Sequence, residues 1–230
     1  MGFATRIVCL ANSRKRDGHC VAGLEVEAEG KLGKWIRPVG PRESESLIPS
    51  ERCYPGGTEP RLLDIIELEL LEHVPHGHQT ENYRAHPGRP WKKVGRMEQV
   101  QLAAAAQKFP GSLWWDGGSG AHGFNDMVPA TKMAGFRHSL LLLIPDRIRM
   151  EVTEEGPARK RKVRVDLLFG YMHYLLPVTD PVAERRFERL GLGKFPCEPL
   201  PLCVSLGKPY PEPDGPCYKL VASLVGLPGN

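Results

Sequence analysis

The sequence predicts a mainly β protein with few helices. Glycine and proline are frequent, with 25 Gly and 22 Pro in 230 residues, and this composition favours many turns over long helices. Short apolar or alternating runs typical of strands recur along the whole chain, whereas helical periodicity is found in only two places. The order of elements repeats, since in each half a helix follows a third strand and precedes further strands. This is the order of the small Greek-key barrel called the OB-fold, so we expect two tandem OB-like β-barrels.

The first half carries the less regular set of elements. The segment 62–71 alternates Ile66, Leu68 and Leu70 with polar neighbours, which is typical of a half-buried strand. Four consecutive alanines favour a helix over 97–109, which Pro110 would end. We expect strands at 6–11, 19–26, 34–37, 62–71 and 139–144.

The second half is more sharply patterned. Ile148, Met150 and Val152 alternate with charged residues in a strand over 147–152. Strands over 162–169 and 171–178 form a hairpin that turns near Gly170. Asp180 is a good N-cap for a helix over 181–190, and Pro181 suits its first turn. Strands at 202–206 and 217–225 complete this half.

We place the domain boundary near residues 145 and 146. The first OB-like domain then covers residues 1–145, and the second covers residues 146–230. Two long segments, 39–61 and 72–95, are expected to be loop insertions in the first domain, because they lack a clear strand or helix pattern.

Composition excludes several classes of protein. The formal charge of +4 is too small to indicate a partner by itself, and no apolar run approaches the ~20 residues that span a bilayer. The first residues lack the features of a secretion signal. The six cysteines form no Cys-x-x-Cys pair and are too sparse for a disulfide scaffold. We therefore expect a cytoplasmic protein that has reduced cysteines and no membrane partner.

The loop between the first two strands is a candidate phosphate contact. It combines three cations with two small hydrogen-bonding side chains, which suits contact with a nucleic acid backbone as well as an ordinary solvated turn. Its residues are Asn12, Ser13, Arg14, Lys15 and Arg16.

Trp35 and Arg37 are candidates for stacking on bases. Side chains alternate along a strand, so these two share one face of the expected strand at 34–37. An aromatic plane beside a guanidinium can stack on a base. The same pattern also fits a core tryptophan that is covered by the aliphatic part of an arginine.

Four of the eight histidines lie within residues 73–86, in the segment that begins with His73 and His76 and contains Asn82. Their irregular spacing, the breaks at Pro75 and Gly77, and the lack of a nearby cysteine argue against a metal site. We expect a polar loop that recognises a base, sugar or phosphate, with no metal and no cofactor.

A glycine-rich stretch follows Trp115 and leads to Asn125. Glycine lets the backbone approach a ligand closely, so this is either a ligand-contacting loop or a structural turn; it lacks the Gly-Lys-Ser/Thr of a phosphate-binding P-loop. Arg137 and Lys219 complete the expected nucleic-acid contacts. The cationic run at 159–162 is expected mainly as a solvated hairpin tip, because two glutamates precede it.

Several short motifs together resemble the prokaryotic dual-OB-domain proteins, over nearly the whole chain. The motifs lie at 9–15, 20–23, 35–38, 64–65, 73 with 76, 79–82, 203–207 and 217–222. The resemblance implies two OB-like barrels and, by analogy of fold alone, nucleic-acid binding; it supplies no catalytic residue. The extended tip at 159–162 and the proline-rich loop at 208–216 depart from the family pattern and bear on the ligand surface.

These observations favour a protein that binds single-stranded or structured RNA or DNA. No catalytic motif is recognisable, so we expect a binding protein rather than an enzyme. One alternative is an enzyme that acts on a nucleotide or nucleic acid, with a site around Cys20, Asp64 and the segment from His73 to His86. A second alternative is a module that holds a protein or an oligosaccharide.

Overall fold

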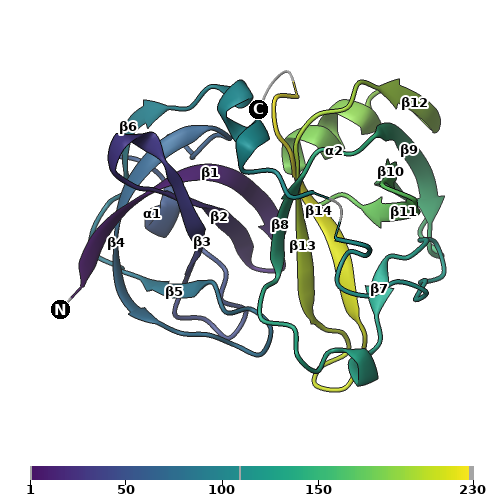
Figure 1. The fold of residues 1–230 in the computed structure, drawn as a ribbon, viewed down its shortest axis with the longest axis horizontal. Coiled ribbons are helices and arrows are strands. Elements are labelled where there is room, and N and C mark those ends of the chain that lie inside the picture. The colour runs from purple at the N-terminus through teal and green to yellow at the C-terminus, as the bar shows by residue number, and fades with distance from the viewer. Residues whose placement is uncertain (1, 109, 228–230) are drawn as a thin grey trace. The chain divides into compact units, whose positions relative to one another are not determined.

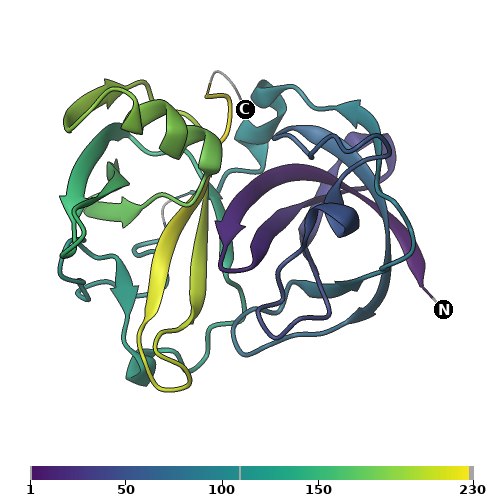
Figure 2. The ribbon, with the colours of Figure 1, turned by 180° about the vertical axis from the view of Figure 1, so that it is seen from behind.

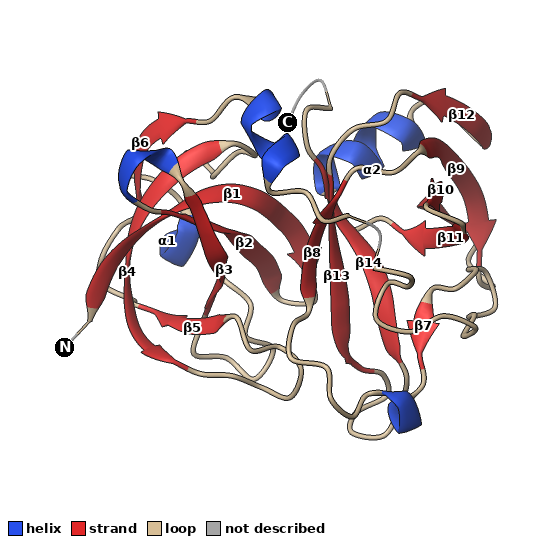
Figure 3. Cartoon of the chain, viewed as in Figure 1, coloured by secondary structure: helices blue, strands red, loops and turns tan. Residues whose placement is uncertain are grey.

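The computed structural model describes residues 2–108 and 110–227. The chain folds into two compact units, and the division falls between Ala105 and Ala106 (Figure 1). Strands account for 48% of the residues and helices for 11%, which confirms the mainly β fold class (Figure 3). Each unit is described separately below.

Unit 1 contains six strands, and five of them close into a barrel. The strands are β1 (Phe3–Lys15), β2 (Gly18–Val26), β3 (Leu32–Val39), β4 (Asp64–His73), β5 (Asn82–Ala85) and β6 (Lys92–Arg96). The short helical segments are η1 (Ala28–Gly30), α1 (Pro49–Arg52) and η2 (Gln99–Ala104).

The pairing of unit 1 is that of an OB barrel. The strand order is β1-β2-β3-β5-β4, and β4 pairs back onto β1, so the ring closes (Figure 2). β3 and β5 run parallel, whereas every other pair in the ring is antiparallel. β6 adds to β4 outside the ring, and α1 lies in the connection from β3 to β4. The expected OB-like barrel is therefore confirmed in this unit.

Strand β1 pairs with β4 and with β2. Its first half pairs with β4, and it pairs with β2 over most of its length, with a bulge between Cys9 and Ala11. At Gly23 the two strands approach so closely that a Cβ would lie 2.0 Å from the carbonyl oxygen of Val8. Only glycine fits there, which gives a physical reason for the small residue in this segment of β2.

Unit 2 contains two four-stranded sheets. One has the order β11-β10-β9-β12 and the other β7-β14-β13-β8. The strands are β7 (Met127–Val128), β8 (Leu140–Leu143), β9 (Arg147–Glu155), β10 (Lys160–Phe169), β11 (Met172–Pro177), β12 (Gly193–Cys197), β13 (Leu202–Pro209) and β14 (Cys217–Leu224). The helical segments are η3 (Ala130–Lys132) and α2 (Pro181–Glu188).

Unit 2 keeps the OB order of elements but is a more open structure. The series β9, β10, β11, α2, β13, β14 repeats the order of three strands, a helix and two strands. A parallel bridge joins Val178, just after β11, to Val221 of β14, as β3 joins β5 in unit 1. β9 and β13 correspond to β1 and β4, whose pairing closes the barrel of unit 1. In unit 2, β9 pairs instead with β12, and β13 pairs with β8. A shared apolar core fills the space between the sheets.

Helix α2 forms where the sequence predicts it. The Asp180 carboxylate accepts hydrogen bonds from the backbone N–H groups of Val182 and Ala183, and Pro181 occupies the first turn. Ala183 and Phe187 are buried against the core of unit 2.

Several boundaries differ from the sequence analysis. The expected helix over 97–109 is only the 3-10 segment η2, and Phe109 lies outside the described residues. The expected loop insertion at 72–95 contains β5 and β6, whose short polar sequences carry no clear alternation, and the 39–61 segment contains α1. The units divide at residue 105 and not near residue 145, because β7 and β8 pair with β14 and β13.

The described residues include no helix that is long and apolar enough to cross a membrane. All six cysteines are free thiols, three of them buried and three partly exposed.

Candidate nucleic-acid interface

An aromatic cluster lies on the outside of unit 1 and draws one residue from each of four strands. The Tyr83 ring of β5 lies 4.7 Å from the His73 ring of β4 and 6.1 Å from the Phe3 ring of β1, measured between centroids. The Lys34 ammonium of β3 lies 5.1 Å from the Tyr83 centroid. Phe3 is 43% exposed, and His73 and Lys34 are also exposed. We call these four residues the aromatic cluster.

Lys34 is held in its charged form within the aromatic cluster. Its ammonium donates a hydrogen bond of 3.0 Å to the Tyr83 hydroxyl. This bond raises the pKa of Lys34, and the effect outweighs the lowering that partial burial causes. The Phe3 ring meets the Tyr83 ring edge-on and the His73 ring is tilted against it. The cluster therefore presents aromatic rings together with a positive charge at neutral pH, which is the combination that binds bases and phosphates.

Three connections of unit 1 meet at the carboxylate of Glu45. Its Oε1 lies 3.3 Å from Nδ1 of His76, in the β4–β5 connection, and its Oε2 lies 4.0 Å from Nζ of Lys15, at the end of β1. Glu45 itself belongs to the connection from β3 to α1. The structure thus brings together Lys15 and His76, two residues that the sequence analysis selected separately. We call Lys15, Glu45 and His76 the loop junction.

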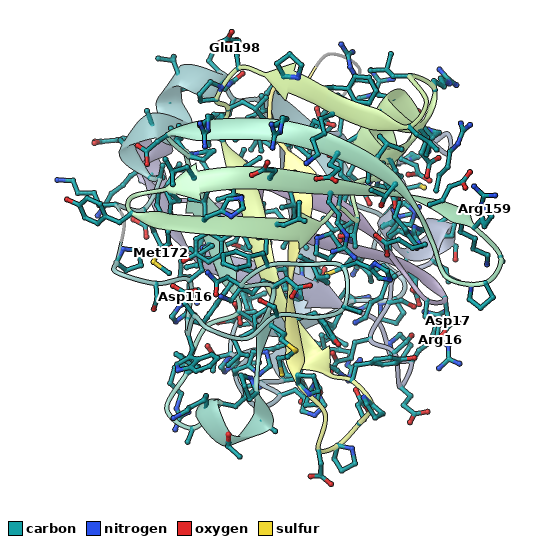
Figure 4. The ribbon with its side chains drawn as sticks, turned by 90° about the vertical axis from the view of Figure 1, so that its right-hand side faces the viewer. Arg16, Asp17, Asp116, Arg159, Met172 and Glu198 are labelled. Carbon is teal, nitrogen blue, oxygen red and sulfur yellow. The ribbon has the colours of Figure 1, made fainter. Side chains whose placement is uncertain are left out.

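Residues 12–16 divide into a structural part and an exposed part. The Asn12 amide donates 2.9 Å to the Pro60 carbonyl, and its oxygen lies 2.7 Å from Nδ1 of His19. Ser13 is buried, whereas Arg14 and Arg16 are exposed. Figure 4 shows Arg16 and Asp17 at the tip of the β1–β2 hairpin.

Arg37 and Asn82 form a buried polar pair in the barrel wall. The Arg37 guanidinium donates 3.2 Å to the Asn82 amide oxygen, and the two residues face each other across the parallel β3–β5 pair. Arg37 is 3% exposed and Asn82 is fully buried, while Trp35 is partly exposed. The expected surface pairing of Trp35 with Arg37 is therefore not seen, because Arg37 is buried against Asn82.

The glycine-rich loop of unit 2 is fastened by Asn125. Its amide oxygen accepts 2.8 Å from the Gly117 N–H, and its amide nitrogen donates 3.0 Å to the His173 carbonyl. Trp115 is half-buried against the core of unit 2, with the Lys132 ammonium 5.9 Å from its ring. The buried Asn125 side chain therefore holds the loop in its conformation.

Lys219 is a buried cation and not a surface one. It is 0% exposed, and its ammonium donates 2.8 Å to a carboxylate oxygen of Asp116. The other oxygen of Asp116 accepts 2.8 Å from the Tyr174 hydroxyl. Burial lowers the pKa of Lys219, and the hydrogen bond and charge of Asp116 oppose that change. Arg137, by contrast, is exposed and donates to the Phe136 carbonyl.

Sequence reasoning missed a second polar and aromatic group, on the outer face of unit 2. His173 Nε2 lies 2.6 Å from an Asp166 oxygen, and the other Asp166 oxygen accepts from Arg149. The exposed Phe124 ring lies 5.2 Å from the His173 ring. The alternation of β9 placed Arg149 outward, but no sequence signal links it to His173. Figure 4 shows this sheet with Arg159 at one end and Met172 at the other.

Asp64 and His73, two residues of the enzyme alternative, lie far apart. Asp64 and His73 are the first and last of the ten residues of β4, so roughly 30 Å of strand separates them. Asp64 is buried and accepts from the Tyr54 hydroxyl at 3.0 Å, while Lys93 pairs with it at 2.6 Å. Across residues 2–108 and 110–227, no group of three or more His, Cys, Asp and Glu side chains is placed to hold a metal ion.

A closed OB barrel followed by a more open OB-like unit defines a protein of tandem OB-fold domains. The family described as the dual OB-containing domain matches residues 5–224, which is nearly the whole chain. The chain belongs to this family, and the resemblance seen in its sequence motifs is confirmed. Neither the curated proteins nor the solved structures gave a significant match.

Proposed function

We propose that this protein binds single-stranded nucleic acid through unit 1, with bases stacked on the aromatic cluster and phosphates held by the neighbouring cations. The observation that carries the proposal is the aromatic cluster around Tyr83, which draws one ring from each of β1, β4 and β5 and the Lys34 ammonium from β3. Every base has a π-face, so such a platform accepts unpaired bases with little regard to sequence.

The charges of unit 1 support this choice of ligand. The Lys34 ammonium lies at the hydroxyl end of the Tyr83 ring, and the exposed Arg14 and Arg16 lie at the β1–β2 hairpin tip. Cations supply most of the affinity for a phosphate backbone, and aromatic planes favour unpaired over paired bases. OB barrels of other proteins bind oligonucleotides and oligosaccharides through the face of strands 2 and 3 and the loops that follow strands 1 and 4. Lys34 lies on β3, and Arg16 lies in the β1–β2 connection.

The test is a binding titration of the full chain with labelled single-stranded oligonucleotides, both DNA and RNA, followed by fluorescence anisotropy. We expect affinity to fall as salt rises, with a slope of about −0.7 per neutralised phosphate on a log–log plot. A duplex of the same length should bind more weakly, because its bases are already stacked and paired.

Two outcomes would contradict the proposal. One is the absence of binding to every oligonucleotide pool at low salt. The other is binding that does not change between low and moderate salt. Retention of a protein partner after nuclease treatment, or of an oligosaccharide, with no nucleic-acid binding would instead favour an interaction module.

A further inference from the structure

We propose that the loop junction is a phosphate site for the bound strand, and that the Glu45 carboxylate occupies the place of that phosphate in the free protein. This inference rests on the proposed function, since it assigns one contact and one competing group to the same unit. It predicts that Glu45 weakens binding, and that its removal strengthens it.

The geometry is that of an anion held between a lysine ammonium at the end of β1 and a histidine ring in the β4–β5 connection. The carboxylate lies 3.3 Å from the His76 ring nitrogen and 4.0 Å from the Lys15 ammonium. The His76 and Lys15 side chains are about 59% and 28% exposed, so a ligand from solvent can reach both. The Glu45 side chain itself is 15% exposed. Its contact with Lys15 is long, at 4.0 Å, so a stronger anion that reaches Lys15 and His76 can displace the carboxylate.

A phosphate is the stronger anion. It presents more acceptor oxygens than a carboxylate and forms charge-assisted hydrogen bonds with lysine and with protonated histidine. The exposed Arg14 and Arg16 flank Lys15 along the chain and Asp17 follows them, so the β1–β2 hairpin tip carries a net positive charge that attracts a phosphate.

The backbone at Glu45 favours the same interpretation. Glu45 has φ of +57°, a conformation that usually belongs to glycine or asparagine. It is fixed by hydrogen bonds from its own N–H to the Arg42 carbonyl at 2.8 Å and from the Gly40 N–H to its carbonyl at 3.3 Å. A long carboxylate at a position where the backbone prefers a small residue points to a use for the side chain.

The loop junction lies within reach of a nucleic-acid strand whose bases stack on the aromatic cluster. His73 belongs to the cluster and His76 to the junction, and three residues of chain span at most about 10 Å. One strand can therefore place a base on the rings and a nearby phosphate at the junction.

The experiment compares the wild type with Glu45→Gln by oligonucleotide titration of the full chain at a fixed low salt concentration. We expect the substitution to tighten binding about 3- to 10-fold, since it removes one competing negative charge. Glu67→Gln is the matched control. It removes the same charge from the same unit, where Glu67 pairs with Arg6 at 3.0 Å outside the junction, and it should change affinity less than 2-fold.

A double-mutant cycle separates the proposed role from a general effect of charge. If Glu45 acts by occupying the site of Lys15, then Glu45→Gln should give a much smaller gain in a Lys15→Gln background. Glu45→Asn serves as a second variant, because asparagine tolerates the positive φ and also lacks the charge. It should tighten binding as Glu45→Gln does.

The outcomes are distinct. Unchanged or weaker binding by both folded Glu45 variants, with normal binding by the wild type, overturns this inference and leaves the proposed function intact. An equal gain from Glu67→Gln, or a full gain in the Lys15→Gln background, also overturns it. No binding by any variant contradicts the proposed function itself.

Discussion

The ammonium of Lys219 lies 2.8 Å from the carboxylate of Asp116, although 103 residues separate them in the chain. The Tyr174 hydroxyl completes the arrangement through the second oxygen of Asp116, and the Tyr174 ring lies 5.0 Å from the Lys219 ammonium. This pair joins the start of the glycine-rich loop to the first part of β14. The role of Lys219 is therefore to hold unit 2 together, because its charge is fully covered.

Loss of this pair should destabilise the protein strongly. Replacing Lys219 by methionine leaves the Asp116 carboxylate mostly buried without its cation, which typically costs about 3–5 kcal/mol. Urea unfolding at pH 7 measures the change. The control is Lys194→Met, because the Lys194 side chain is half exposed and pairs loosely with Glu151 at 3.6 Å. A loss of less than about 1 kcal/mol for Lys219→Met would show that the pair contributes little.

Tyr83 should carry much of the base-stacking energy of the proposed interface. Tyr83→Ala removes the central ring of the aromatic cluster, and loss of one stacking ring costs about 1–3 kcal/mol, or roughly 5- to 150-fold in affinity. Tyr83→Phe keeps the ring and loses only the hydrogen bond from Lys34, so it should retain most of the affinity. Tyr171, which is 95% exposed in unit 2, provides the control Tyr171→Ala. Equal effects of Tyr83→Ala and Tyr171→Ala would argue against the aromatic cluster.

Asp166 should contribute to stability at neutral pH and lose that contribution in acid. Burial raises the pKa of Asp166, but the hydrogen bonds from His173 and Arg149 outweigh it, and the net shift is downward from 3.8. A carboxyl whose pKa is lower in the folded state stabilises the fold above its unfolded pKa. The contribution disappears as pH falls below about 4 and through the lowered value.

The measurement is the free energy of unfolding of the wild type and Asp166→Asn at pH 6 and pH 3. We expect the variant to lose up to about 1 kcal/mol at pH 6 and to match the wild type more closely at pH 3. A difference that is the same at both values would mean that titration of Asp166 does not contribute to acid sensitivity.

Asp180 should be important to unit 2 beyond its role in capping α2. One of its oxygens accepts from the Val182 and Ala183 N–H groups, and the other accepts 3.1 Å from the Leu224 N–H of β14. Asp180→Ala leaves these donors unsatisfied, and we expect a loss of about 2 kcal/mol or more. Asp180→Asn keeps an acceptor for the helix and should lose less. Thermal unfolding of both variants distinguishes them, and equal losses would mean that the cap itself is unimportant.

The elements that the sequence predicted well are those with a strong local signal. β9 alternates apolar and charged residues, and α2 begins with a capping aspartate and a proline, so neighbours in the chain suffice to define them. β5 gives no such signal, because it has only four residues, Asn82–Ala85. Two of the three that pair with β3, Asn82 and Arg84, are polar or charged. Its parallel pairing closes the barrel, and that pairing depends on residues more than forty positions away.

The sequence by itself determined that the chain is a mainly β protein with OB-like order, that Asp180 begins a helix, and that the cations of residues 12–16 lie near a hairpin tip. Only the tertiary structure decided which polar residues are available to a ligand. Arg37 and Lys219 have the sequence character of surface cations, yet both are buried. Their side chains donate hydrogen bonds to Asn82 and Asp116, respectively. Likewise, Tyr83 meets Phe3 and His73 only because β5 lies beside β4 and β4 beside β1. Burial and contact between distant segments are properties of the closed sheet, and no local pattern of residues encodes them.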